Sequence, residues 1–212
     1  MAQKFLYVFA TDVAEKTMKD RQARIKQVEP QPATGKIGQL FADVQAKFDM
    51  VPNIFRMLAK APAAFEGLMN LSAALAGGTL DKKTREQLGL AIAESNLCDY
   101  CLSAHRYLGA RAGLTPAEID DAIRASAAHP KTDALLKLAR GMIVQRGELT
   151  DANLKRARAA GLTDGEIIET VANVALNIFE NYLCHVTQVP IDFPQNKSRD
   201  ESSQGGDSSG ER

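Results

Sequence analysis

Helical periodicity is the feature of this sequence that most restricts its fold. From about residue 34 to about residue 187, apolar side chains recur three or four positions apart, and no convincing segment alternates apolar and polar residues as a half-buried strand does. The pattern is clear after Thr34, a plausible N-cap, with apolar residues at Ile37, Leu40, Phe41, Val44 and Phe48. Further helices are expected between Pro52 and Pro62, from Pro62 to Gly77, and at about 82–95, 97–112, 115–128, 130–146, 150–160 and 163–187. The sequence therefore predicts an all-α fold.

Two helix junctions, 48 residues apart, carry the same start signal. The segments Gly113-Leu-Thr-Pro-Ala-Glu-Ile119 and Gly161-Leu-Thr-Asp-Gly-Glu-Ile167 each place glycine at a helix end and threonine three positions before glutamate. Threonine and glutamate at this spacing form a capping box, in which each side chain binds the backbone N–H of the other residue. Both segments are therefore predicted as helix starts, and two short matches do not establish an internal repeat.

The composition argues against several classes of function. Lys plus Arg and Asp plus Glu each total 26, so the formal net charge is zero and no basic surplus is present for binding nucleic acid. No apolar stretch approaches the roughly 20 residues that span a bilayer. The apolar run at residues 5–10 is too short for the core of a signal peptide. We therefore expect a cytoplasmic protein that binds neither nucleic acid nor membrane. Because the charges balance, we also expect the protein to self-associate.

The two ends of the chain differ in composition from the helical region. Residues 1–33 hold a short apolar run and then a charged stretch that ends near Pro30-Gln-Pro32. Residues 196–212 are mostly serine, glycine and charged residues, and they cannot bury enough apolar surface to offset the entropy of ordering. The sequence therefore predicts an N-terminal extension at 1–33, one helical domain at 34–195 and a disordered tail at 196–212.

The cysteines indicate the chemistry. Three are present, and Cys98 and Cys101 form a Cys-x-x-Cys pair, which in a reducing compartment is typical of redox or metal chemistry. Cys98, Cys101 and His105 lie at i, i+3 and i+7, so they share one face of a helix. With Ser95-Asn96 as the expected N-cap, Cys98 falls in the first turn, where free N–H groups favour a thiolate. One short element thus supplies a nucleophile, a resolving thiol and a base.

Glu86 is the expected partner of His105. It lies twelve residues before Cys98 on the preceding helix. If the two helices pack antiparallel, its carboxylate can accept a hydrogen bond from His105 and hold the imidazole in one tautomer. Its basic neighbours at positions 82–85 leave a surface ion pair open as the alternative.

The spacing of these residues resembles a known signature. Glu86, eleven residues, Cys98-x-x-Cys101, three residues and His105 are similar to the pattern of the alkylhydroperoxidase D (AhpD)-like and carboxymuconolactone decarboxylase superfamily, in particular its peroxidase-related branch. The likeness runs from residue 35 to about residue 193 and includes Met50-Val-Pro-Asn-Ile-Phe55. It implies an AhpD-like all-α fold that assembles as homotrimers or homohexamers.

The resemblance also implies a function and roles for the site residues. It implies a thiol-dependent peroxidase for alkyl hydroperoxides or hydrogen peroxide, reduced by a dithiol or a protein, and we expect neither cofactor nor metal. By the resemblance, Cys101 attacks the peroxide, Cys98 resolves it as a disulfide, and His105 backed by Glu86 belongs to a proton relay. One position departs from alkylhydroperoxidase D, which has a relay histidine just before its second cysteine. Here Tyr100 stands there, and its pKa of about 10 makes it a poor base.

Other classes of site remain open. Two thiolates and an imidazole on one helix could supply three metal ligands, with Glu86, Cys184 or His185 as a fourth, although structural zinc sites more often use ligand pairs from separate elements. A redox-sensing or thiol–disulfide exchange module would use the same disulfide as a switch. Cys184-His185 lies in the apolar run at 171–186, where a free cysteine commonly packs as a small hydrophobe, so it is predicted as core.

Overall fold

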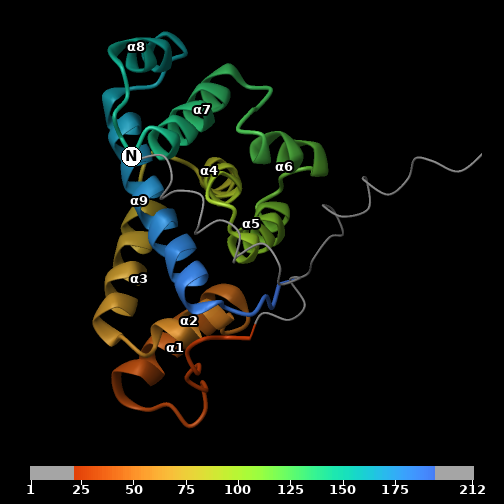
Figure 1. The fold of residues 1–212 in the computed structure, drawn as a ribbon, viewed down its shortest axis with the longest axis vertical. Coiled ribbons are helices and arrows are strands. Elements are labelled where there is room, and N and C mark those ends of the chain that lie inside the picture. The colour runs from red at the N-terminus through yellow and green to blue at the C-terminus, as the bar shows by residue number, and fades with distance from the viewer. Residues whose placement is uncertain (1–21, 194–212) are drawn as a thin grey trace, which may run out of the picture.

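The computed structural model describes residues 22–193, and within them it contains nine helices and no strand (Figure 1). The helices are α1 (Gly35–Phe48), α2 (Asn53–Leu58), α3 (Pro62–Ala76), α4 (Lys82–Ser95), α5 (Asp99–Arg111), α6 (Pro116–Ile123), α7 (Pro130–Val144), α8 (Asp151–Ala159) and α9 (Asp164–Thr187). The all-α prediction is confirmed. In this part of the chain no helix is long and apolar enough to cross a membrane.

The capping boxes predicted from the repeated segment are present. Thr115 accepts a hydrogen bond from the backbone N–H of Glu118 at the start of α6, and the Glu118 carboxylate accepts one from the backbone of Thr115. Thr163 and Glu166 make the same reciprocal pair at the start of α9. Helix α6 ends earlier than the expected residue 128, because Ala125 adopts a left-handed φ of 54° that the helix cannot continue through.

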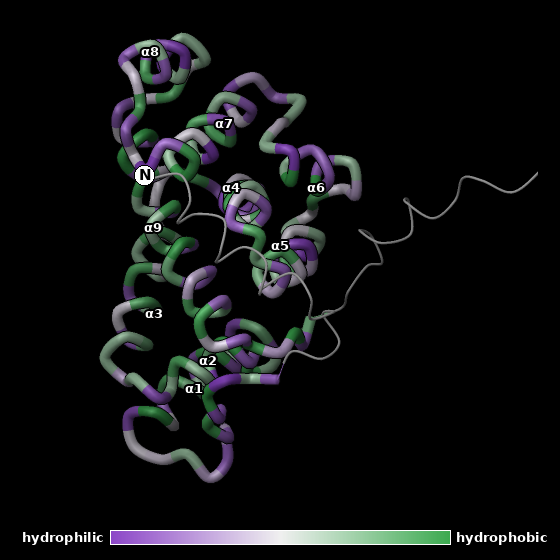
Figure 2. The backbone as a smooth tube through the Cα atoms, in the orientation of Figure 1, coloured by the Kyte–Doolittle hydropathy of each residue, from purple (hydrophilic) through white to green (hydrophobic). Residues whose placement is uncertain are grey.

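Helix α4 lies at the centre of the fold and packs against α5, α6, α7 and α9 (Figure 1). Leu88, Leu90 and Ile92 of α4 are fully buried, in a core shared mainly with α6 and α7. A second core gathers α1, α2, α3 and the start of α5, and includes the rings of Phe55 and Phe65, with centroids 5.7 Å apart. Figure 2 shows hydrophobic residues recurring between hydrophilic ones along the helices, the pattern from which the fold was predicted.

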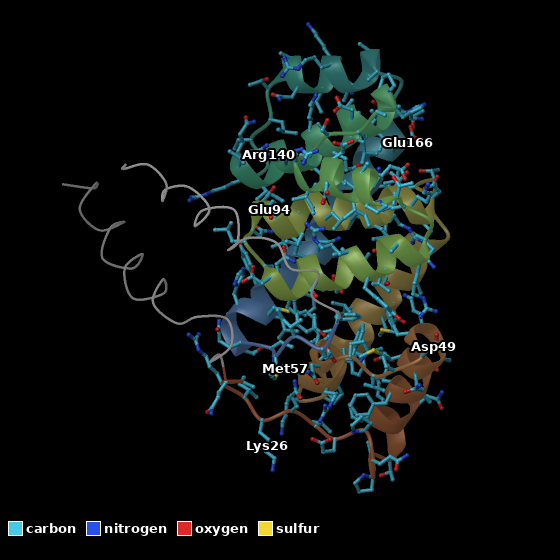
Figure 3. The ribbon with its side chains drawn as sticks, turned by 90° about the vertical axis from the view of Figure 1, so that its right-hand side faces the viewer. Lys26, Asp49, Met57, Glu94, Arg140 and Glu166 are labelled. Atoms are coloured by element: carbon cyan, nitrogen blue, oxygen red, sulfur yellow. The ribbon has the colours of Figure 1, made fainter. Side chains whose placement is uncertain are left out.

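Helix α9 is the longest element and joins the two cores. It packs against α2 and α3 in one half of the molecule and against α4 and α7 in the other. Figure 3 shows the order along the long axis: Arg140 of α7 and Glu166 of α9 lie toward one end, Glu94 of α4 lies between, and Met57 and Asp49 lie toward the other. Side chains on α9 can therefore face α4 and α5 where the two cores meet.

The junction between α4 and α5 corrects one prediction. The expected N-cap at Ser95-Asn96 is wrong, because α4 continues through Ser95, whose hydroxyl donates to the carbonyl of Ala91 at 2.7 Å. Leu97 then takes a left-handed φ of 56°, which redirects the chain. Helix α5 begins at Asp99, and Cys98 is its N-cap. The first cysteine thus stands immediately before the helix and not inside its first turn.

The chain segments that flank the helices contact the domain. In residues 22–33, part of the expected N-terminal extension, the backbone N–H of Arg24 donates to the carbonyl of Thr187 at 2.9 Å. The backbone N–H of Val28 donates to the carbonyl of Arg56 at 3.0 Å. The rest of that extension, with the run at residues 5–10, and the expected disordered tail at 196–212 lie outside the described residues.

Candidate active site

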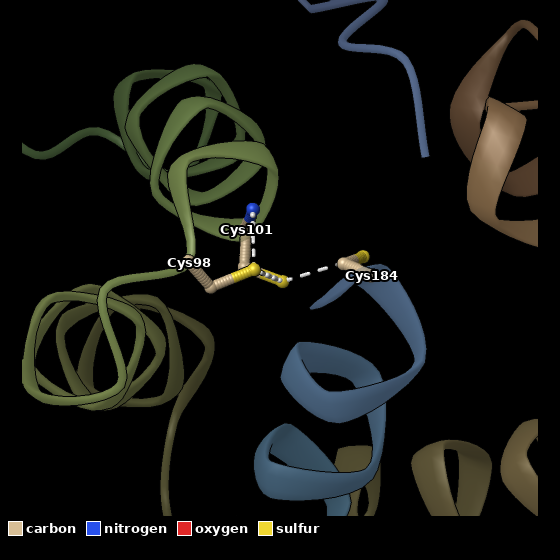
Figure 4. Close-up of side chains that lie close together, drawn as sticks. All are labelled: Cys98, Cys101 and Cys184. Carbon is tan, nitrogen blue, oxygen red and sulfur yellow. Dashed lines mark hydrogen bonds between the residues drawn. The ribbon is translucent and has the colours of Figure 1, made fainter. Parts of the chain in front are cut away.

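Cys98 and Cys101 lie with their sulfur atoms 2.8 Å apart (Figure 4). Both side chains are buried, with exposed fractions of 2% and 4%. A disulfide bond measures about 2.05 Å, so small side-chain rotations suffice to join the two sulfurs. The spacing on the sequence predicted this pairing, and the turn that makes Cys98 the N-cap of α5 brings its sulfur over the backbone N–H of Cys101 at 3.4 Å.

A third cysteine completes what we call the thiol cluster: Cys98, Cys101 and Cys184 (Figure 4). The Cys184 sulfur on α9 lies 3.8 Å from that of Cys101, and the three sulfurs all lie within 4.8 Å of one another. The prediction that Cys184 is buried is confirmed, with an exposed fraction of 5%. The contact between Cys184 and Cys101 was not predicted from the sequence. The two residues are 83 positions apart and meet only because their helices pack together, so the spacing within either helix does not indicate the contact.

The three thiols differ in acidity. The hydrogen bonds that Cys98 accepts from the Cys101 and Cys184 thiols and from the Cys101 backbone lower the pKa of Cys98 to about 3, against the opposing effect of burial. Burial raises the pKa of Cys101 well above its usual value. The hydrogen bond with Cys101 lowers the pKa of Cys184. The hydrogen bond with Cys98 and burial have the larger combined effect and raise the pKa of Cys184 above its usual value. Cys98 is therefore the most acidic thiol of the cluster.

The predicted pairing of Glu86 with His105 is present. His105 Nδ1 lies 2.8 Å from Glu86 Oε2, and His105 Nε2 lies 3.1 Å from the Asn177 side-chain oxygen. The Asn177 amide nitrogen donates to the carbonyl of Asn173, which leaves its oxygen to accept from the histidine. Each ring nitrogen therefore faces an acceptor oxygen, an arrangement that favours the protonated imidazolium form. Burial alone would lower its pKa, but the hydrogen bond and charge of Glu86 outweigh burial and raise it.

This protonation state changes the role expected for His105. The sequence predicted a base one turn beyond Cys101, whereas the imidazolium has no lone pair left to take a proton from a thiol. Its ring is held against α4 at Gly89, where an added Cβ would lie only 2.3 Å from the ring. His105 can therefore stabilise negative charge that develops nearby.

Glu180 is a further site residue that the sequence analysis did not single out. It lies on α9, three residues after Asn177 and four before Cys184, so the three share one helix face. Burial raises the pKa of Glu180 to about 7, the positive charge of His105 opposes this, and the negative charge of Glu86 adds to it. A carboxyl group within the apolar run at 171–186 was the signal that could have identified it.

Two cavities open on either side of Tyr100. The Cys101 cavity, of about 60 Å³, holds Cys101, His105 and Glu180 among mostly apolar side chains; the others are Phe48, Pro52, Ile54, Phe55, Tyr100, Ala104, Leu108 and Phe193. The Cys98 cavity, of about 50 Å³, is lined by Cys98, Asp99, Tyr100, Cys184, His185, Gln188, Val189, Pro190 and Ile191. Cys101 thus faces a different opening from Cys98 and Cys184.

Tyr100 has a structural role. Its hydroxyl donates to Asp192 at 2.9 Å and accepts from the backbone N–H of Ile54 at 3.2 Å. Burial and the charge of Asp192 raise the pKa of Tyr100 far above its usual value. It therefore ties α5 to α2 and to the segment after α9, and it does not replace a relay histidine.

The geometry also bears on the metal alternative. His105 is bonded through both ring nitrogens, and among the described residues the group of possible ligand atoms that lie close together is the three sulfurs of the thiol cluster. Two thiolates bound to zinc at about 2.3 Å in tetrahedral geometry lie roughly 3.8 Å apart. The Cys101–Cys184 distance matches that value, whereas the 2.8 Å between Cys98 and Cys101 is too short for two thiolates on one zinc ion.

Comparison with known proteins gives a consistent family. Residues 62–141, which include Glu86, both cysteines of the pair and His105, match the model of the carboxymuconolactone decarboxylase family. No curated protein matches the chain.

Several solved structures share the fold. One is an AhpD core described as an uncharacterized peroxidase-related protein from Ralstonia eutropha JMP134, with 27% identity, a TM-score of 0.73, and coverage of 80% of this chain and 93% of that chain. Another peroxidase-related protein, from Silicibacter sp. TM1040, has 20% identity, a TM-score of 0.71, and coverage of 79% and 90%. The debrominase Bmp8, in complex with 2,3,4-tribromopyrrole, has 13% identity, a TM-score of 0.69, and coverage of 81% and 94%. The chain therefore belongs to the AhpD-like carboxymuconolactone decarboxylase superfamily.

Proposed function

We propose that this protein is a thiol-dependent peroxidase, an antioxidant oxidoreductase that reduces alkyl hydroperoxides or hydrogen peroxide with Cys98 and Cys101 as its redox pair. The observation that carries the proposal is two cysteine sulfurs 2.8 Å apart, with Cys101 lining a cavity that also holds two titratable groups, His105 and Glu180. The peroxidase-related names of two structural neighbours agree with it.

The first step is attack by Cys101. Its sulfur bonds to the terminal oxygen of the hydroperoxide, and the O–O bond breaks. The alkoxide leaving group takes the proton of the Glu180 carboxyl group, and the Cys101 proton passes to the Glu180 carboxylate in the same cavity. The products are an alcohol and a sulfenic acid on Cys101, while Cys98 remains a thiolate and Glu180 is protonated again. The charge of His105 stabilises the alkoxide as it forms.

The second step closes the disulfide. The Cys98 thiolate attacks the sulfenic sulfur of Cys101, the S–O bond breaks, and the hydroxide leaves as water with the Glu180 proton. One hydroperoxide has then become an alcohol and water, and the two cysteines have become one disulfide. A dithiol or protein reductant restores the thiols by exchange, and Glu180 regains a proton from solvent. We place the protein in the cytoplasm, where reducing conditions keep these cysteines as thiols.

A coupled assay with hydrogen peroxide, cumene hydroperoxide and several dithiol reductants tests the function. We expect continuous peroxide consumption only when reductant is present, and loss of two of the three free thiols per chain when it is absent. Oxidation of the pair without turnover under any reductant would instead support a redox-sensing module.

Single-turnover measurements test the division of labour. Cys101→Ser should abolish consumption of even the first equivalent of peroxide, whereas Cys98→Ser should still consume one equivalent. Mass spectrometry then identifies the oxidised residue. An inert Cys98→Ser variant, together with a sulfenic acid on Cys98 in Cys101→Ser, would reverse the roles and show that the low pKa of Cys98 decides the attack.

A further inference from the structure

Cys184 takes no part in the peroxidase cycle just described. Even so, all three cysteines of the chain meet in one cluster, although Cys184 comes from a helix that begins more than 50 residues after α5 ends. Its sulfur lies 3.8 Å from that of Cys101, which is about 1.8 Å longer than a disulfide bond. Two buried thiols at this distance can be joined by side-chain rotation and a small shift of one helix.

The surroundings of Cys184 also differ from those of an ordinary core cysteine. Its side chain lines the Cys98 cavity together with Cys98 and His185, so the sulfur has an opening on the side of the cluster away from the Cys101 cavity. Cys101 thus lies between a peroxide-facing cavity and a second thiol that faces a separate opening.

We propose that Cys184 is a second resolving cysteine, which forms a disulfide with Cys101. The inference rests on the proposed peroxidase function. The Cys184 sulfur attacks the sulfenic sulfur of Cys101, the S–O bond breaks, and the hydroxyl group leaves as water with the Cys184 proton. In the wild type, Cys98 lies closer to Cys101 and resolves first.

The same contact permits exchange after the first disulfide has formed. Cys184 attacks the Cys101 sulfur of the Cys98–Cys101 disulfide, Cys98 leaves as a thiolate, and the Cys184 proton passes to solvent. A thiol of low pKa leaves fastest, and the hydrogen bond from the Cys101 backbone to Cys98 favours its thiolate. The resulting Cys101–Cys184 disulfide has one sulfur at the Cys98 cavity, where a dithiol reductant can attack it.

The decisive variant is Cys98→Ser, treated with one equivalent of cumene hydroperoxide. We expect peptide mapping by mass spectrometry to find a Cys101–Cys184 disulfide, and dimedone to trap little sulfenic acid. The matched control is Cys98→Ser with Cys184→Ala, in which the Cys101 sulfenic acid should persist and over-oxidation to sulfinic acid should rise at least about tenfold. Thermal melting of both variants checks that alanine fills the buried site without loss of fold.

Two outcomes separate failure of this inference from failure of the proposed function. If dimedone labels Cys98→Ser as fully as the double variant, Cys184 does not resolve Cys101, and the inference is overturned while the peroxidase stands. If neither variant reacts with peroxide, the same experiment is repeated with diamide, which oxidises neighbouring thiols directly. A Cys101–Cys184 disulfide formed with diamide in Cys98→Ser would support the thiol pairing without the peroxidase, and its absence would reject the pairing.

Discussion

Glu180 and His105 line the same cavity, yet their environments shift their pKa values for different reasons. His105 lies between two acceptors, Glu86 and Asn177, and the hydrogen bond and charge of Glu86 raise its pKa against the effect of burial. For Glu180, burial outweighs the positive charges of His105 and Lys47 and raises the pKa of its carboxyl group to about 7. Glu180 therefore changes its charge near neutral pH, and its protonation should control the rate.

The Glu180→Gln variant tests this role. If the carboxyl group donates its proton to the leaving alkoxide, wild-type turnover of cumene hydroperoxide should fall as the pH rises above about 7, because Glu180 ionises there. Glutamine should lower kcat about 10- to 100-fold and remove that pH dependence. The control is Glu148→Gln on the exposed loop after α7, which should keep both the rate and the profile. An unchanged pH profile in Glu180→Gln would reject Glu180 as the proton donor.

At the scale of helices, the sequence predicted the contacts between neighbouring helices and did not predict those between helices far apart in the chain. The bounds of α4 and the Glu86–His105 contact were predictable, because they depend on one helix and its immediate neighbour in the chain. The contacts of Asn177, Glu180 and Cys184 with the site were not, because they depend on the packing of α9 against α5 between residues more than 70 positions apart. The apolar periodicity of α5 or of α9 does not indicate which face of one helix packs against the other helix.

The start of α5 shows a different kind of failure. Serine and asparagine are strong N-cap residues, so Ser95-Asn96 favoured a helix beginning there. A serine hydroxyl can equally bond the carbonyl four residues earlier, and here it bonds that of Ala91 inside α4. The left-handed Leu97 then allows Cys98 to take the cap position. This turn decides the acidity of Cys98, so a local error in the cap changes the expected chemistry.

Close approach of α4 and α5 at Gly89 gives a prediction at this scale. In Gly89→Ala, the new Cβ would lie 2.3 Å from the His105 ring, so the ring must move and its hydrogen bond to Glu86 should be lost. Alanine favours a helix over glycine by about 1 kcal/mol, which partly offsets the clash in the stability of the fold. We expect kcat/KM for cumene hydroperoxide to fall at least about tenfold, and the pKa of His105, followed by NMR, to fall toward its usual value.

The matched control is Gly67→Ala. Gly67 lies within α3, where an added Cβ meets no atom within 4 Å, so the same substitution should leave the rate and the histidine pKa unchanged. If Gly89→Ala loses stability but keeps the His105 pKa and the rate, Gly89 serves packing alone and does not position the histidine.

At the scale of the whole molecule, α9 has two different faces. One face carries Asn177, Glu180 and Cys184 toward the site. The other carries large apolar side chains at helical spacing that remain exposed, at Ile168 (69%), Val171 (51%), Phe179 (39%), Tyr182 (59%) and Val186 (63%). A contiguous apolar stripe of this length is typical of a subunit interface. The homotrimer or homohexamer implied by the family resemblance would cover it.

Light scattering on glutamate variants of the stripe tests the proposed assembly. The wild type should have three or six times the 23.0 kDa mass of one chain, and Val171→Glu with Val186→Glu should shift it toward that of one chain, because buried charges without partners are costly. Val144→Glu is the control, since Val144 of α7 is as exposed, at 69%, but lies outside the stripe, so this variant should keep the wild-type mass. A monomeric wild type at micromolar concentration would reject self-association. An assembly that survives the double substitution would place the interface elsewhere on the surface.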